Sequence, residues 1–207
     1  MRLTTAARAG ALATAVTLLG LASTAAPAQA TTTENPTPFA SQIRRAGLTA
    51  SQAAQLQHRV DRYLAQYGGK QVSANRILIP DGQITVAVPG ETYARDLGAT
   101  KKSAAKSAVR TPSGTVLPAD ASDCAYKNFC GWKGAHYTGD IWQKGKCNVY
   151  AEIPRGWNSG GSWWNNQTPG TVARMYGKTY NFVYQTPPAS SYDPTGNWGP
   201  VWYVKPC

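Results

Sequence analysis

Residues 124–132 read CAYKNFCGW and contain two of the four cysteines of the chain. The other two, Cys147 and Cys207, lie in the same C-terminal part, as do all seven tryptophans. Four cysteines permit three pairings. Five residues separate Cys124 from Cys130, enough for a tight local bridge, which would leave Cys147 to bond Cys207. We therefore expect a small domain that two disulfides hold together and large rings fill.

The stretch from residue 121 to 207 carries the pattern of an all-β domain. Short aromatic and β-branched runs, such as HYTGDIW (136–142), TVARMY (171–176) and YNFVYQT (180–186), alternate with Gly, Pro, Asn and Asp. Strands and turns that alternate in this way favour a sandwich or barrel of Greek-key strands. No part of the stretch has the 3.6-residue period of a helix.

Residues 48–97 form a different kind of segment. Thr49 and Gln52 have the spacing of a capping box, and apolar residues then recur at three- and four-residue steps up to Tyr67. Gly68 ends this predicted helix. Two runs rich in Val and Ile flank Pro80-Asp81-Gly82 and predict a β-hairpin. One helix over one hairpin has a marginal core, so the segment is either an accessory domain or a pro-segment that is later removed.

The first thirty residues have the features of a signal peptide. Arg2 and Arg8 precede an apolar run of about a dozen residues, and Ala28-Gln29-Ala30 fits a cleavage site. The run is too short to span a membrane. A Thr/Pro-rich segment (31–47) follows, expected to be flexible, and a linker rich in Ala, Ser, Lys and Pro (98–120) precedes the β domain. We expect a secreted, extracellular protein without a membrane span.

The charge of the chain is strongly positive but dispersed. The 21 basic and ten acidic residues give a formal net charge of +11. Apart from a KKSAAK stretch in the linker, there is no long basic helix or arm. We interpret the charge as a source of solubility and of weak attraction to anionic surfaces, and expect no nucleic-acid partner.

The cysteine-rich stretch resembles a known family. The Cys-x5-Cys opening, Gly131-Trp132 and the step Tyr137-Thr138-Gly139 resemble the small secreted metalloproteinase inhibitors of streptomycetes. The run SGGSWWNNQTPGTVARMY (159–176) is similar to the second half of such domains. The resemblance covers residues 124–207 and implies a bacterial peptidase inhibitor with a βγ-crystallin-like sandwich of two Greek keys. It also supports the Cys124–Cys130 bridge, whereas the inhibitory loop of the family maps onto no motif here.

Crystallin-like domains raise the question of calcium. Their sites typically read Asn/Asp-Asn/Asp-x-x-Ser/Thr-Ser. The corresponding run here is Asn165-Asn166-Gln167-Thr168-Pro169-Gly170, with proline and glycine where two hydroxyl ligands belong. Calcium prefers a shell of six to eight oxygens, so we expect no metal and no cofactor.

Catalysis is not expected either. An enzyme needs a nucleophile with a base, paired carboxylates or a metal cluster. The β domain offers a single histidine and four carboxylates: His136, Asp123, Asp140, Glu152 and Asp193. None of them stands in a context that indicates an active site, so we expect a binding protein, and a secreted hydrolase is the least favoured alternative.

A cluster of Trp and Asn residues beside a Gly/Ser-rich loop is the predicted binding surface. Its members are Trp157, Asn158, Trp163, Trp164, Asn165 and Asn166. We expect Trp157 and one of the adjacent pair Trp163 and Trp164 to be accessible, because neighbours on a strand point to opposite faces. Such a surface would contact an extracellular protease or, alternatively, a cell-wall glycan.

Overall fold

The computed structural model describes residues 39–99 and 123–207. The predictions for the leader, for most of the Thr/Pro-rich segment and for most of the linker lie outside these residues. None of the helices in the described ranges is both long and apolar enough to cross a membrane.

The N-terminal part of the described chain contains the expected helix and hairpin. Helix α1 (Ala40–Arg45) precedes α2 (Ala50–Tyr67), and strands β1 (Lys70–Gln71), β2 (Arg76–Ile79) and β3 (Gly82–Thr85) follow. The capping box is present, because the Thr49 hydroxyl accepts from the Gln52 amide at 3.2 Å and the Gln52 side chain accepts from the Thr49 amide at 2.9 Å. Gly68 ends α2 with a positive φ of 67°. The predicted helix and hairpin are confirmed.

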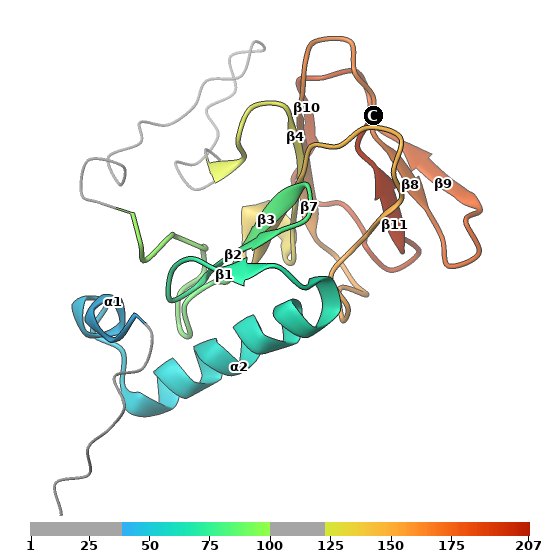
Figure 1. The fold of residues 1–207 in the computed structure, drawn as a ribbon. Coiled ribbons are helices and arrows are strands. Elements are labelled where there is room, and N and C mark those ends of the chain that lie inside the picture. Colours follow the sequence, from blue (N-terminus) through green and yellow to red (C-terminus); the bar gives the residue numbers. More distant parts are fainter. Residues whose placement is uncertain (1–38, 100–122) are drawn as a thin grey trace, which may run out of the picture. The chain divides into compact units, whose positions relative to one another are not determined.

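Eight further strands build the C-terminal part: β4 (Asn128–Trp132), β5 (Ile141–Lys144), β6 (Ala151–Glu152), β7 (Ser162–Asn166), β8 (Arg174–Tyr176), β9 (Phe182–Gln185), β10 (Ser191–Asp193) and β11 (Tyr203–Lys205). The 3₁₀ turn η2 (Ala135–Tyr137) lies between β4 and β5. All strand pairs are antiparallel. The predicted antiparallel β domain is confirmed (Figure 1).

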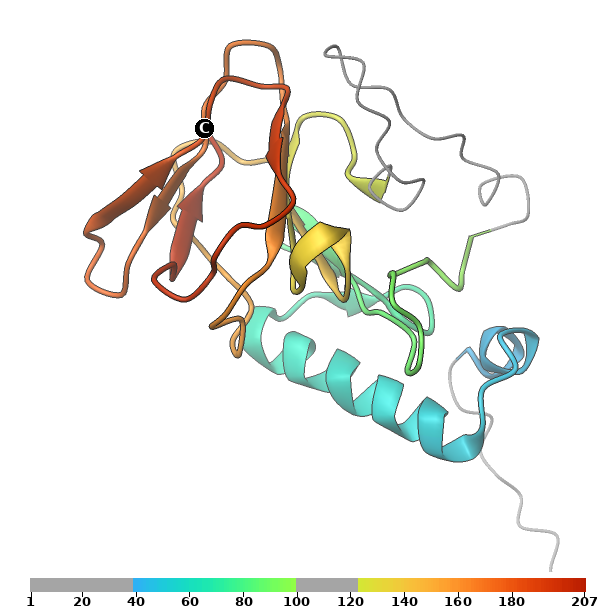
Figure 2. The same ribbon diagram turned by 180° about the vertical axis from the view of Figure 1, so that it is seen from behind.

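The strands form two sheets with an exchange between them. One sheet has the order β1-β2-β3-β5-β4-β7-β10, and the other has the order β6-β11-β8-β9. Strands β4, β5 and β7 lie in the first sheet, whereas β6 lies in the second. Strands β8, β9 and β11 lie in the second sheet, whereas β10 lies in the first. Strands β8, β9 and β11 of the second sheet lie beside one another in Figure 1, and Figure 2 shows the same group from behind. Such reciprocal exchange suits two Greek-key halves, whereas the crystallin-like identity of the sandwich stays a prediction.

The helix and hairpin do not keep a core of their own. Strand β3 pairs with β5, with Ile84 opposite Trp142. Leu56 and Val60 of α2 belong to the same buried cluster as Phe129 and Trp142 of the β domain. The core that looked marginal is thus completed by the β domain, because burying apolar surface across this junction supplies what the short segment lacks.

Both disulfides have the expected partners. Cys124 bonds Cys130, six positions away, and Cys147 bonds Cys207, 60 positions away. No cysteine within the described ranges is left free. The longer bridge attaches the last residue of the chain to the loop between β5 and β6.

Candidate functional site

The structure places most of the predicted binding surface in the interior. The side chains of Trp157, Trp163 and Trp164 are only 4%, 3% and 4% exposed, and Asn165 is fully buried. The prediction that Trp157 and one of the adjacent pair would be accessible was therefore wrong. Of the six residues, Asn158 is exposed and Asn166 is half-buried.

The glycines beside these tryptophans explain the burial. A Cβ atom on Gly161 would lie 2.0 Å from Nε1 of Trp198, and one on Gly131 would lie 2.8 Å from the same indole. Trp198 in turn donates from Nε1 to the Trp132 carbonyl at 2.7 Å and packs against Trp157, with ring centroids 5.8 Å apart. Gly131 and Gly161 have no side chain, so the Trp198 indole can lie directly on the backbone there. These glycines are a packing requirement and not the sign of a mobile loop.

The buried side chain of Asn165 connects three neighbouring segments by hydrogen bonds. Its Nδ2 donates to the Thr171 carbonyl at 2.9 Å and to the Thr186 hydroxyl at 3.2 Å, while its Oδ1 accepts from Gln167 at 2.9 Å. A buried amide is stabilised by such bonds. Because Gln167 already donates to its oxygen, Asn165 is a poor candidate ligand for calcium. No group of three or more His, Cys, Asp or Glu suited to a metal occurs in residues 39–99 and 123–207; that the protein needs no cofactor stays a prediction.

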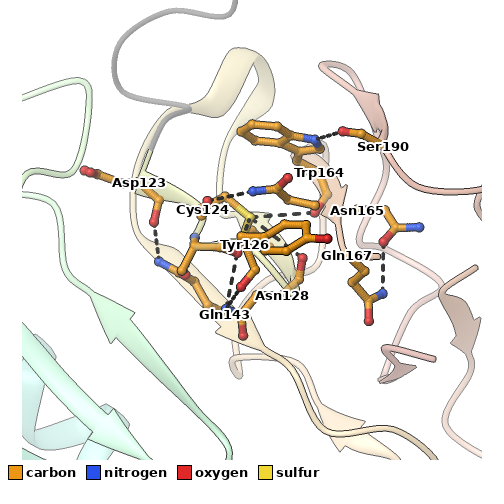
Figure 3. The surroundings of a disulfide bond; sticks show 12 residues. Asp123, Cys124, Tyr126, Asn128, Gln143, Trp164, Asn165, Gln167 and Ser190 are labelled. Atoms are coloured by element: carbon orange, nitrogen blue, oxygen red, sulfur yellow. Dashed lines mark hydrogen bonds between the residues drawn. A yellow bond between two sulfur atoms is a disulfide. The ribbon is translucent and has the colours of Figure 1, made fainter. Parts of the chain in front are cut away.

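Asn166 has a second role, in the loop that the first disulfide closes. Its Nδ2 donates to the Cys124 carbonyl at 3.0 Å, and its own carbonyl accepts from the Lys127 amide at 2.8 Å. On the other side, Gln143 accepts from the Ala125 amide at 3.0 Å and donates to the Asp123 carbonyl at 2.7 Å. The loop is therefore held from both β7 and β5 (Figure 3).

The braced loop exposes Ala125, Tyr126 and Lys127, and Tyr126 is its exposed ring. Its side chain is 60% exposed, although the loop around it is tied by the disulfide and by the bonds from Gln143 and Asn166. Lys127, the next residue, has a φ of 70°, a left-handed conformation that defines the turn. Sequence reasoning missed Tyr126, although the Cys-x5-Cys spacing already indicated a closed loop with a tyrosine in it.

A pocket of about 370 Å³ lies at the other end of the predicted surface. Residues 152–158 line one side, and Gly199, Val201 and Trp202 line the other. Trp157 and Asn158 both belong to the lining. Two of the six predicted residues thus share a concave site, and the other four do not.

The carboxylates of the β domain have structural partners rather than catalytic ones. Asp140 is buried and accepts from Tyr63 and Arg59 of α2. Glu152 pairs with Arg155, and Asp193 accepts from the Thr195 amide. His136 lies in the η2 turn with a φ of 53°. The expectation that the protein is not an enzyme stays a prediction, and these contacts are in keeping with it.

Comparison with known proteins gives a family match over the region that contains the Cys124–Cys130 loop. Residues 118–182 match the model of the peptidase inhibitor family I36. The matched range contains the Cys124–Cys130 loop and runs from before β4 to the start of β9. The searches of curated proteins and of solved structures gave no match. The resemblance of the Cys-x5-Cys stretch to an inhibitor family is thereby confirmed.

Proposed function

We propose that this protein is a secreted peptidase inhibitor directed at metallopeptidases, and that the Cys124–Cys130 loop is the part that enters the peptidase. The match of residues 118–182 to an inhibitor family carries the proposal. The preference for metallopeptidases comes from the resemblance of the same stretch to the streptomycete inhibitors. The two disulfides and the predicted leader support an extracellular location.

The loop has the physical properties that tight inhibition needs. A segment that is rigid before it binds loses little conformational entropy on binding, and the disulfide with its flanking hydrogen bonds provides this rigidity. Tyrosine is a frequent anchor in protein interfaces because it combines a large apolar ring with a hydrogen-bonding hydroxyl. Tyr126, exposed at 60%, is the ring that this loop offers to a cleft.

Inhibition assays with the whole mature chain test the proposal. The panel comprises a thermolysin-like metallopeptidase, a serine peptidase and a cysteine peptidase, each with a peptide substrate. We expect inhibition of the metallopeptidase only. Tyr126→Ala should weaken it by roughly tenfold to a hundredfold, the loss typical of an interface anchor. The fold should persist, because the side chain is exposed.

Phe182→Ala serves as the matched control, since it removes a ring that is 61% exposed on another part of the surface. It should leave inhibition unchanged. Failure of the mature chain to inhibit any of the three peptidases at micromolar concentration would overturn the proposed function. Equal losses from the two variants would overturn the assignment of the loop.

A further inference from the structure

Exposed and half-buried aromatic side chains gather on one face of the second sheet. We name this group the tyrosine face and define it as Tyr150, Tyr176, Tyr180, Phe182 and Tyr203. Tyr180 and Phe182 are 53% and 61% exposed, and Tyr150 is also exposed. A contiguous group of exposed aromatic rings of this kind often marks a binding surface.

The strand register explains why the rings share a face. Tyr203 of β11 lies opposite Tyr176 of β8, and Tyr176 lies opposite Phe182 of β9. The neighbouring residues Val204 and Met175 are buried, as the alternation of a strand requires. Three rings therefore form a row across three adjacent strands, with the Tyr176 and Phe182 ring centroids 6.2 Å apart.

The rings also pack against one another. Tyr180 stacks on Tyr203, with centroids 4.6 Å apart and planes inclined by 16°. Tyr150 meets Tyr176 and Tyr180 edge-on, each at 4.9 Å. A side-chain hydrogen bond with Tyr180 is the main cause that raises the pKa of Tyr203 above its ordinary value. The face is thus a firm surface that presents ring edges and hydroxyl groups.

Basic side chains border the tyrosine face. The Lys205 ammonium lies 5.2 Å from the centre of the Tyr150 ring, and Arg174 is the register partner of Lys205. The Lys178 ammonium lies 5.1 Å from the centre of the Trp202 ring. Glu152, on the strand beside Tyr203, pairs with Arg155 at 3.2 Å. The electrostatic complement of this face is therefore an anionic ligand.

We propose that the tyrosine face binds a linear polysaccharide that carries carboxylates. A row of rings across adjacent strands suits an extended polymer of repeating units. Sugar hydroxyls exchange hydrogen bonds with the tyrosine hydroxyls, apolar C–H groups contact the exposed Phe182 ring, and carboxylates pair with Lys178 and Lys205. The two disulfides fit a location outside the cell, where such polymers occur. This surface is separate from the proposed inhibitory loop, so the inference goes beyond the proposed function.

A single-stranded nucleic acid is also a linear polyanion. The geometry of the rings favours an acidic polysaccharide over a nucleic acid. Base stacking requires open ring faces. Here Tyr180 and Tyr203 cover each other, and the Lys205 ammonium lies over Tyr150. Edges, hydroxyls and ammonium groups remain for the ligand, and these match the hydroxyls and carboxylates of an acidic sugar.

The test measures binding of the whole mature chain to polygalacturonate by isothermal titration calorimetry. The same polymer with its carboxyl groups methylated is the neutral ligand control, and poly(dT) is the nucleic-acid probe. We expect polygalacturonate to bind at least about tenfold more tightly than either, and added salt to weaken it. Phe182→Ala and the double variant Lys178→Gln/Lys205→Gln should each weaken binding by about tenfold.

Two variants control for general effects. Tyr126→Ala removes an exposed tyrosine outside the face, and Lys70→Gln/Lys133→Gln makes the same change in net charge elsewhere. Both should bind polygalacturonate as the unmodified chain does. Absence of binding, equal affinity for the methylated polymer, tighter binding of poly(dT) or equal losses in the controls would each overturn the inference. The two tests have separate outcomes. Phe182→Ala should still inhibit the peptidase but bind the polymer weakly, and Tyr126→Ala should bind the polymer normally but inhibit weakly.

Discussion

The buried carboxylate of Asp140 in the β domain binds donors from residues 39–99, and so links the two parts of the described chain. It is 2% exposed and accepts hydrogen bonds from the Arg59 guanidinium, from the Tyr63 hydroxyl at 2.6 Å and from the Ala87 amide at 2.8 Å. Burial, and after it the charge of Asp140, raise the pKa of Tyr63, so its hydroxyl remains a donor. A buried charge with three donors is stable only while all of them stay in place.

Replacing that carboxylate should therefore be costly. Asp140→Asn leaves Arg59 without its counter-charge and should lower the free energy of unfolding by about 3 kcal/mol, as for other broken buried pairs. Urea denaturation measures the loss. Glu152→Gln removes a carboxylate that pairs with the exposed Arg155, and should cost no more than about 1 kcal/mol. Similar losses in both variants would contradict the role given to Asp140.

Helix α2 begins and ends at signals close to it in the sequence, namely the capping box at Thr49 and Gln52 and the glycine Gly68. The reciprocal bonds of Thr49 and Gln52 start the helix, and Leu56, Val60 and Tyr63 bury one of its sides. Its polar side remains in water, with Gln57 bonded to Asp61 one turn away. The helix thus depends on its cap at one end and on packing along its length.

Loss of the cap should be measurable in the intact protein. Thr49→Ala removes the hydroxyl that accepts from the Gln52 amide and should lower the free energy of unfolding by about 1 kcal/mol. Ser51→Ala, two positions further on, removes a hydroxyl within the first turn, where alanine is a good helix former, and should be close to neutral. Thermal unfolding followed by circular dichroism compares the two. A Thr49→Ala variant as stable as Ser51→Ala would mean that packing alone holds the helix start.

At the scale of the molecule, the junction between β3 and β5 makes one sheet of two sequence segments. Four residue pairs join the strands, from Gly82 opposite Lys144 to Thr85 opposite Ile141. Without residues 39–99, strand β5 would become an open edge, and Asp140 would lose its three donors. We therefore expect residues 39–99 to stay associated with the β domain even when the linker is cut.

Separating the two segments should expose this dependence. We expect residues 121–207 alone to lose the near-ultraviolet circular dichroism of their packed tryptophans, or to unfold at much lower urea than the mature chain. A protease site placed between residues 100 and 120 provides the control, because a cut there should leave both pieces associated in gel filtration. A fragment as stable as the whole chain would contradict the prediction.

What could be read from the sequence depends on the range over which each signal acts. The helix cap at Thr49, the turn at Asp81 and the local bridge from Cys124 to Cys130 involve groups only a few residues apart. Such signals work through hydrogen bonds, backbone preference and chain length, so the sequence predicted them correctly. The partner of Cys147 then followed by elimination.

The tertiary structure alone decided what is buried and what is exposed. Trp157 lies inside because Trp198, some forty positions away, packs on it, and Gly161 lets that indole reach the backbone. The tyrosine face exists because the register of β11, β8 and β9 turns rings from distant positions to one side. Burial is a property of contacts between remote segments, which a pattern of neighbouring residues does not contain. The sequence by itself therefore determined the class of fold and its cross-links, and long-range packing determined which surfaces are left to bind.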